Sequence, residues 1–138
     1  MATIGVDFDG VCHAYSKGWR DGTIYDDPVP GTFEALAGLM STYSVFIFTA
    51  RTDLQEVAGW VEARSGIRCL VDDGNIGFWT DRNRLLVTCR KVAAIAYIDD
   101  RAIRFTDWGQ ALAELAAHED DYHAKTRSAS AVNPAAAG

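Results

Sequence analysis

The stretch Thr3-Ile4-Gly5-Val6-Asp7-Phe8-Asp9-Gly10-Val11 carries most of the information about the fold. It begins as an apolar run over residues 3–8, which is typical of a buried strand, and it ends in two acids and a glycine. The same pattern returns at Tyr97-Ile98-Asp99-Asp100-Arg101, where another apolar run ends in acids. Apolar runs and helical patterns alternate between these two stretches, as they do in a parallel sheet with crossover helices. We therefore predict an α/β fold, a three-layer Rossmann-like parallel sheet with helices on both faces.

Apolar periodicity and helix-start signals place the remaining elements. Helices are expected to begin at Pro30-Gly31-Thr32, at Thr52 and at Asp107. The spacing from Thr52 to Gln55 is that of a capping box. Strands are expected at residues 3–8, 43–49, 67–71, 85–89 and 94–98, with a short edge strand at 102–105.

The chain length fits one folded domain, because 138 residues leave no room for a second core. The apolar pattern of the last helix stops near His118. We therefore assign residues 1–118 to a single domain and expect residues 119–138 to be a flexible C-terminal tail.

Composition and charge exclude several classes of function. With 49% hydrophobic and 23% charged residues, the sequence resembles neither a disordered nor a membrane-spanning chain. The formal net charge of -6 argues against nonspecific binding to a nucleic-acid backbone, which needs a basic face. It does not exclude a small phosphorylated substrate held beside a divalent cation. The absence of a signal-peptide pattern and the odd count of three cysteines favour a reduced, cytoplasmic protein.

Two pairs of acids at predicted strand ends point to a divalent cation. Asp7 and Asp9 lie at the end of the first strand, and Asp99 and Asp100 follow the strand at residues 94–98. Like charges this close tolerate one another beside a cation or when one of them is protonated. Four carboxylates at the carboxyl ends of strands would form an oxygen-rich site of the kind that Mg²⁺ prefers.

Thr49-Ala50-Arg51 and Lys91 add groups that suit a phosphoryl group. A hydroxyl and backbone amides at a strand-to-helix junction can hold phosphate oxygens, and a lysine supplies a point charge. Each signal alone is weak, because a threonine often ends a strand and lone basic side chains are usually solvated. The order of the motifs is more specific. In two-component receiver domains the lysine comes last, whereas here the second acid pair follows it.

The order Asp-x-Asp, Thr, Lys, Asp-Asp resembles that of the haloacid dehalogenase-like (HAD) superfamily of phosphohydrolases. The resemblance runs from residue 3 to about residue 115, and it is strongest to small phage and bacterial members and to the phosphatase domain of phage polynucleotide kinase. It implies a HAD-like catalytic domain, a short flap at about residues 11–30 in place of a cap domain, Mg²⁺ as cofactor and an aspartyl-phosphate intermediate.

The resemblance also implies roles for the acids. Asp7 occupies the position of the nucleophile, and Asp9 that of the acid that protonates the leaving oxygen and later activates water. The cation would be held by Asp7, by the backbone carbonyl of Asp9 and by an acid of the last motif. Asp99 and Asp100 both qualify for that last place, and we favour Asp100 as the direct ligand, with Asp99 either behind the direct ligands or acting through water.

The remaining site residues follow from the same resemblance. Thr49 and Lys91 would hold the transferring phosphoryl group, and Arg90 is an alternative to Lys91 because Lys91 lies close to Asp99 in sequence. Further substrate-binding residues are expected to be Gly10, Ala50, Arg51 and Arg101. Flap residues that are candidates for contact with the leaving group are His13, Tyr15, Lys17, Trp19 and Arg20.

These features predict a Mg²⁺-dependent phosphatase, a hydrolase of phosphoric monoesters, whose substrate is small and phosphorylated. Nucleotides and nucleic-acid ends are among the candidate substrates, and the oligomeric state is left open. One alternative is a non-catalytic HAD-like domain that binds Mg²⁺ and a phosphorylated ligand. Another is a structural protein whose acids form a solvated rim. The presence of both Asp7 and Asp9 favours the enzyme.

Overall fold

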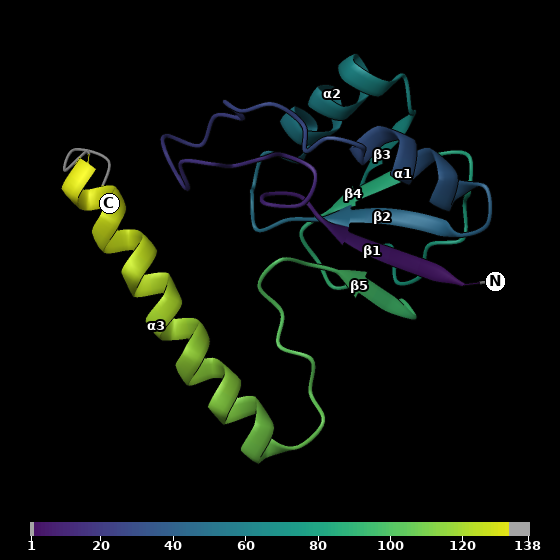
Figure 1. Cartoon of the computed structure of the whole chain (residues 1–138). Coiled ribbons are helices and arrows are strands. Elements are labelled where there is room, and N and C mark those ends of the chain that lie inside the picture. The colour runs from purple at the N-terminus through teal and green to yellow at the C-terminus, as the bar shows by residue number, and fades with distance from the viewer. Residues whose placement is uncertain (1, 133–138) are drawn as a thin grey trace. The chain divides into compact units, whose positions relative to one another are not determined.

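A computed structural model describes residues 2–132, and it describes side chains as far as residue 124. The chain forms two compact units, Met1–Asp100 and Arg101–Gly138. The first contains a sheet with two helices, and the second contains one long helix (Figure 1). The division falls after Asp100, whereas the sequence prediction places the end of the domain at residue 118.

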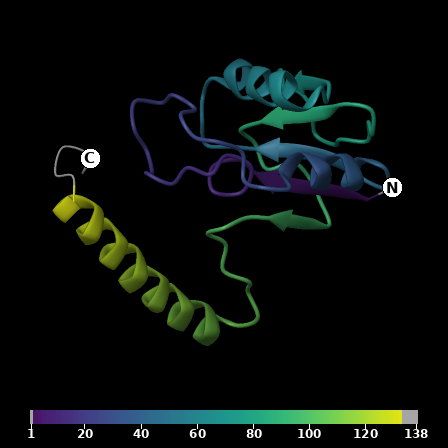
Figure 2. The same ribbon diagram turned by 45° about the horizontal axis from the view of Figure 1, so that its top comes forward.

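The first unit is built on a five-stranded sheet with the strand order β3-β4-β2-β1-β5. Every neighbouring pair of strands is parallel, and Figure 2 shows the arrows pointing the same way. The predicted parallel α/β sheet is therefore confirmed, with strands slightly shorter than expected. The strands are β1 (Thr3–Asp7), β2 (Ser44–Phe48), β3 (Cys69–Val71), β4 (Leu85–Thr88) and β5 (Ala96–Ile98).

Two helices connect the early strands. Helix α1 (Thr32–Met40) begins after Gly31, where the sequence predicts it. Helix α2 (Leu54–Ser65) is capped by Asp53, whose side chain accepts a hydrogen bond from the amide of Glu56. The predicted capping box at Thr52 and Gln55 is therefore wrong by one residue, because the aspartate one position later takes the capping role.

The two faces of the sheet are covered differently. Successive strand residues point to opposite faces. On one face Ile47 packs with Leu36 of α1 and Val57 of α2. On the other face Phe46 packs with Trp79, which lies in an irregular segment between β3 and β4. Within the first unit, both helices contribute to the same core, so the prediction of helices on both faces is not confirmed.

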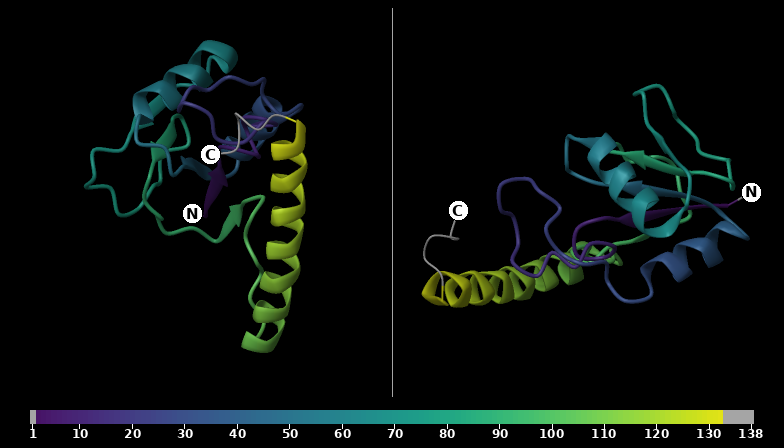
Figure 3. Two further views of the ribbon diagram at one scale, coloured as in Figure 1. Left: turned by 90° about the vertical axis from the view of Figure 1, so that its left-hand side faces the viewer. Right: turned by 90° about the horizontal axis from the view of Figure 1, so that it is seen from above.

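The second unit contains helix α3 (Trp108–Val132), which Figure 3 shows as one continuous helix. It continues past His118, so the predicted end of the helix is wrong. Residues 119–124 lie within this helix although only Glu119 and Ala124 among them are strong helix formers. Residues 133–138 of the predicted tail lie outside the described residues.

Two further observations concern this unit and the chain as a whole. Residues 102–105 contain no strand, so the predicted edge strand is wrong. Gln110 donates its side-chain amide to the carbonyl of Arg104, which ties this segment to the start of α3 instead. Among the residues that the structure describes, no helix has the length and apolar character needed to cross a membrane.

Candidate active site

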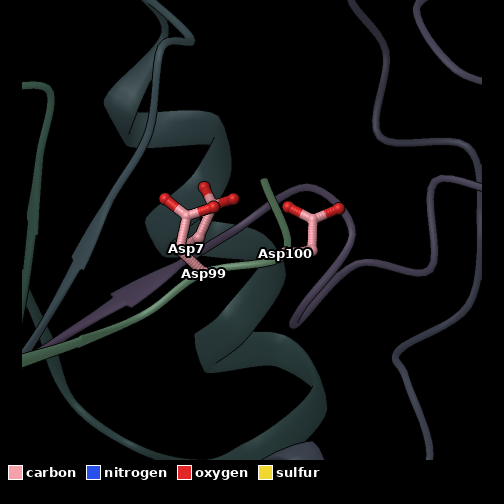
Figure 4. A group of neighbouring side chains, drawn as sticks. All are labelled: Asp7, Asp99 and Asp100. Atoms are coloured by element: carbon pink, nitrogen blue, oxygen red, sulfur yellow. The ribbon is translucent and has the colours of Figure 1, made fainter. Parts of the chain in front are cut away.

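Three carboxylates meet at the carboxyl edge of the sheet. Asp7 is the last residue of β1, and Asp99 and Asp100 directly follow β5, the strand beside it. The pairing of Val6 with Ile98 brings these strand ends level. One carboxylate oxygen from each acid lies within 4.8 Å of the others (Figure 4). The structure thus brings together three of the four acids predicted to surround a cation.

Gly10 makes this approach sterically feasible. A Cβ atom at position 10 would lie 2.1 Å from Oδ2 of Asp100, a distance that no side chain can occupy. The backbone of Gly10 also has a φ of +89°, in the left-handed region that favours glycine. The predicted sharp turn is therefore present, and glycine provides the space in which the Asp100 carboxylate lies. Contact of Gly10 with a substrate stays a prediction.

The acid cluster is electrostatically unfavourable when it holds only negative charge. Burial raises the pKa of the Asp7 carboxyl to about 7, the amide of Phe8 offsets part of this rise, and Asp99 and Asp100 add to it. The Phe8 amide donates to Oδ1 of Asp7 over 2.8 Å. A cation in the cluster would relieve this repulsion without a proton.

The residues fit a small divalent cation. Carboxylate oxygens are the donors that Mg²⁺ takes, and oxygens on opposite sides of one ion lie about 4.2 Å apart when each bond is about 2.1 Å. The spacing within 4.8 Å is close to that geometry. Asp7 and Asp99 are half-buried and Asp100 is exposed, so the cluster is open to solvent on the Asp100 side.

Asp9 has a different environment from Asp7. Its Oδ2 accepts a hydrogen bond from Nε of Arg51 over 2.8 Å, and its Oδ1 accepts one from Nη2 of the same guanidinium over 3.0 Å. Nδ1 of His13 lies 2.8 Å from the same Oδ1. The Asp9 carboxylate is therefore not a member of the acid cluster. A metal contact through its backbone carbonyl stays a prediction.

Arg51 connects Asp9 to the segment between β1 and α1, the predicted flap at residues 11–30. Its Nη1 donates to the carbonyl of Gly22 over 2.7 Å. Its guanidinium lies 5.8 Å from the ring centre of Phe8 and 5.9 Å from that of Trp19. The sequence predicts Arg51 as a substrate-binding residue, but in the structure it is buried and bound to Asp9 and the flap.

Thr49 and Ala50 follow β2 at the same edge of the sheet. Thr49 is buried, its amide donates to the carbonyl of Thr88, and its hydroxyl oxygen accepts from the amide of Arg51 over 3.1 Å. That hydroxyl keeps its own proton as a donor. Ala50 is exposed. A phosphoryl contact through either residue stays a prediction.

Lys91, and not Arg90, is the side chain that suits the predicted phosphoryl role. Arg90 forms a two-point ion pair with Asp72, with Nε donating to Oδ2 over 2.8 Å and Nη2 to Oδ1 over 3.1 Å. Arg90 also donates to the carbonyl of Ile76. Lys91 is exposed, and its Nζ lies 5.1 Å from the centre of the Tyr97 ring. The alternative assignment of Arg90 is therefore not supported.

The flap places the candidate leaving-group residues in contrasting environments. His13 is fully buried, whereas Trp19 is largely exposed and lines a cavity of about 350 Å³ together with Arg51. Lys17 and Arg20 are exposed. The ring of Tyr15 packs against those of His13 and Tyr25. Arg101 is exposed and belongs to the second unit.

Two neighbours of the acids have roles that the sequence does not predict. His13 contacts Asp9, and the only signal is their four-residue separation, which places them side by side only once the intervening turn is known. The thiol of Cys12 donates to the backbone carbonyl of Asp7 over 3.4 Å. Burial raises the pKa of Cys12 to about 12, so this thiol stays protonated and is not a nucleophile.

The fold and the site define a parallel α/β protein with a cluster of acids at the carboxyl ends of β1 and of the edge strand β5. Comparison with protein-family models, with curated proteins and with solved structures finds no match. What the protein does is therefore inferred from its own residues.

Proposed function

We propose that the protein is a Mg²⁺-dependent phosphomonoesterase of the HAD type, with Asp7 as the nucleophile. The observation that supports this most strongly is the grouping of Asp7 with Asp99 and Asp100 at the ends of β1 and β5. The chain runs from β1 to one side of the sheet and returns to its other side at β5, so the cluster lies at the switch point where open α/β sheets bind ligands.

The chemistry follows from the positions of the acids. Mg²⁺, when bound by Asp7, Asp99 and Asp100, would offset the repulsion between a carboxylate and an anionic phosphoryl group. A carboxylate oxygen of Asp7 then forms a bond to phosphorus while the bond from phosphorus to the leaving oxygen breaks. Asp9 supplies the proton that the leaving oxygen needs and later accepts one from the attacking water.

Two further residues would hold the phosphoryl group during this transfer. The Thr49 hydroxyl keeps a proton to donate after accepting the amide of Arg51. Lys91 carries a positive charge at an exposed position after β4. Both groups would stabilise negative charge on phosphoryl oxygens. We propose a small phosphorylated substrate, with nucleotides and nucleic-acid ends among the classes to test.

The alternative, a non-catalytic domain that binds Mg²⁺ and a phosphorylated ligand, shares the acid cluster but makes no use of Asp9. A direct test measures phosphate release from mononucleotides, 3′-phosphorylated oligonucleotides, sugar phosphates and phosphopeptides, with Mg²⁺ and with EDTA. We expect release only with Mg²⁺, and a loss of about 1,000-fold or more in Asp7→Asn. The surface variant Asp81→Asn serves as the control that keeps full activity.

Intact-protein mass after a rapid acid quench separates the roles of the two acids. With an aryl phosphate, whose leaving group needs no proton, we expect a phosphate adduct on wild type and on Asp9→Asn and none on Asp7→Asn. The Asp9→Asn adduct should persist, because the base for its hydrolysis is missing. Full turnover in EDTA, or an adduct on Asp7→Asn, would contradict the mechanism. Wild type without an adduct and without turnover would support the binding domain.

A further inference from the structure

The hydrogen bonds of His13 determine which of its ring nitrogens carries the proton. Nε2 lies 2.9 Å from the backbone nitrogen of Asp26, which can only donate, so Nε2 is the acceptor and bears no hydrogen. The ring hydrogen is therefore on Nδ1, which lies 2.8 Å from Oδ1 of Asp9 and donates to it. Both nitrogens are satisfied by a neutral imidazole, so the network assigns this tautomer.

Packing prevents this ring from turning. His13 has no exposed surface. Its ring stacks on that of Phe8, with the ring planes 24° apart and the ring centres 5.6 Å apart. It also makes T-shaped contacts with Tyr25 and Trp60, whose ring centres lie 5.3 Å and 5.8 Å from its own. Any rotation would leave two buried polar nitrogens without hydrogen-bond partners, which is unfavourable. The imidazole is thus a fixed donor.

His13 and Arg51 together leave Asp9 one site for a proton. A carboxylate offers about four lone-pair sites, two on each oxygen. On Oδ1 one site accepts Nδ1 of His13 and the other accepts Nη2 of Arg51. On Oδ2 one site accepts Nε of Arg51. The remaining site is on Oδ2.

We propose that His13 is a positioning residue for proton transfer by Asp9, and that the transferred proton is carried on Oδ2; this inference rests on the proposed function. In the first step the bond between Asp7 and phosphorus forms, the bond from phosphorus to the leaving oxygen breaks, and the proton moves from Oδ2 of Asp9 to that oxygen. The leaving group departs as an alcohol. His13 keeps its own proton on Nδ1 throughout, because Nε2 has no free lone pair with which to accept a second one.

Two substitutions of His13 separate its two hydrogen bonds. The amide nitrogen of asparagine can take the place of Nδ1, so His13→Asn keeps the donor to Asp9. The terminal group of glutamine reaches the place of Nε2, so His13→Gln keeps the contact with Asp26 and loses the donor to Asp9. Both remove the aromatic ring, so they share its packing loss. His118→Gln, at an exposed position on α3, is the control for general effects of the exchange.

The measurement is the rate of formation of the phosphate adduct in a single turnover, with an aryl phosphate and with an alkyl phosphate. Orientation of Asp9 matters only where the leaving oxygen needs a proton. We therefore expect His13→Gln to lose about 10- to 100-fold with the alkyl phosphate and less than about threefold with the aryl phosphate. His13→Asn should lose less than about fivefold with both substrates.

Equal losses with both substrates, or the same profile for both variants, would overturn the positioning role while leaving the proposed function standing. Absence of turnover and adduct in wild type would overturn the proposed function, and this inference with it. A long-range ¹H–¹⁵N spectrum of the wild-type protein at pH 7 tests the assignment even where a variant fails to fold. We expect hydrogen on Nδ1 and a bare Nε2, and a hydrogen on Nε2 would overturn the inference.

Discussion

At the scale of single residues, the contact between Gly10 and Asp100 shows how a backbone position sets the geometry of the acid cluster. The loop after β1 passes so close to Oδ2 of Asp100 that only a residue without a Cβ atom leaves room for it. Gly31 has nearly the same φ, +87° against +89°, but a Cβ atom there would meet nothing within 4 Å. Substitutions at these two glycines therefore distinguish the effect of backbone strain from that of a steric clash with Asp100.

We expect Gly10→Ala and Gly31→Ala each to lower the free energy of unfolding by about 1–2 kcal/mol, because alanine is strained in the left-handed backbone conformation. Only Gly10→Ala should also displace Asp100, and it should weaken Mg²⁺ binding by about 10- to 100-fold. Isothermal titration with MgCl₂ measures the affinity, and urea unfolding measures the stability. Wild-type Mg²⁺ affinity in Gly10→Ala would show that Asp100 does not hold the cation.

The residue scale also shows how far the candidate site follows from the sequence. Asp7, Asp99 and Asp100 could be predicted to converge, because apolar runs that end in acid become strands whose carboxyl ends share one edge of a parallel sheet. The hydrogen bonds of Asp9 could not be predicted. They depend on the path of residues 11–30, an irregular segment without periodicity, and on an arginine that follows a different strand.

At the scale of elements, β2 and β4 end in the same arrangement of a threonine, an arginine and an aspartate. Thr49 directly follows β2, and Arg51 lies two residues further on. Thr88 is the last residue of β4, and Arg90 lies two residues after it. In each case the threonine hydroxyl accepts from the arginine amide, and the guanidinium forms a two-point ion pair with an aspartate, Asp9 in one case and Asp72 in the other. The ion pair between Arg90 and Asp72 links the loop after β3 to the end of β4.

The pH dependence of stability should reveal this second ion pair. The hydrogen bond from Arg90 lowers the pKa of Asp72 to about 2, and the Thr88 hydroxyl contributes to the same shift. Because the pKa of Asp72 is lower in the folded protein than in the unfolded chain, where it is about 4, the Asp72 carboxylate stabilises the fold at pH values above about 4. This contribution is lost as the pH falls towards 2. We expect Asp72→Asn to lower the free energy of unfolding by about 1–2 kcal/mol at pH 7, a modest loss because solvent screens the partly exposed Arg90. Near pH 2 the same substitution should change it little.

Urea unfolding of wild type and Asp72→Asn at pH 7, 4 and 2.5 measures this difference. Asp81→Asn is the matched control, because Asp81 pairs with Arg84 at a more exposed position and should contribute less. A difference between wild type and Asp72→Asn that does not shrink as pH falls would show that the ion pair is not its source.

The elements themselves were predictable to different degrees. The five strands follow from apolar runs, and α1 follows from its glycine and its apolar face. The continuation of α3 to Val132 could not be predicted from periodicity, because its later residues form a helix without an apolar stripe. The strand expected at residues 102–105 fails for the opposite reason, since apolar residues alone do not provide a partner strand.

At the scale of the whole molecule, both hydrophobic cores are built from residues between Ile4 and Tyr97. Several large apolar side chains of the second unit, such as Trp108 and Leu112, are exposed, and Ile103 is half-buried. We therefore expect a chain of residues 1–104 to fold with a free energy of unfolding within about 1 kcal/mol of that of the full chain. Urea unfolding followed by far-UV circular dichroism measures this.

Tyr97→Ala provides the comparison for that truncation. Tyr97 packs against Phe46 and Phe48 on the sheet, and its loss should cost about 2–3 kcal/mol. A truncated chain that loses as much as Tyr97→Ala would show that residues 105–138 contribute to the stability of the first unit.

The pairing of β1 with β5 has a consequence for the protein as it is synthesised. Ile4 pairs with Ala96, so the strand made first is completed by the strand made last in its unit. At about 5–20 residues per second, Asp7 leaves the ribosome several seconds or more before Asp100. Until then Asp7 lacks the carboxylates of Asp99 and Asp100, which complete the acid cluster. The acid cluster therefore exists only in chains that have been translated as far as Asp100.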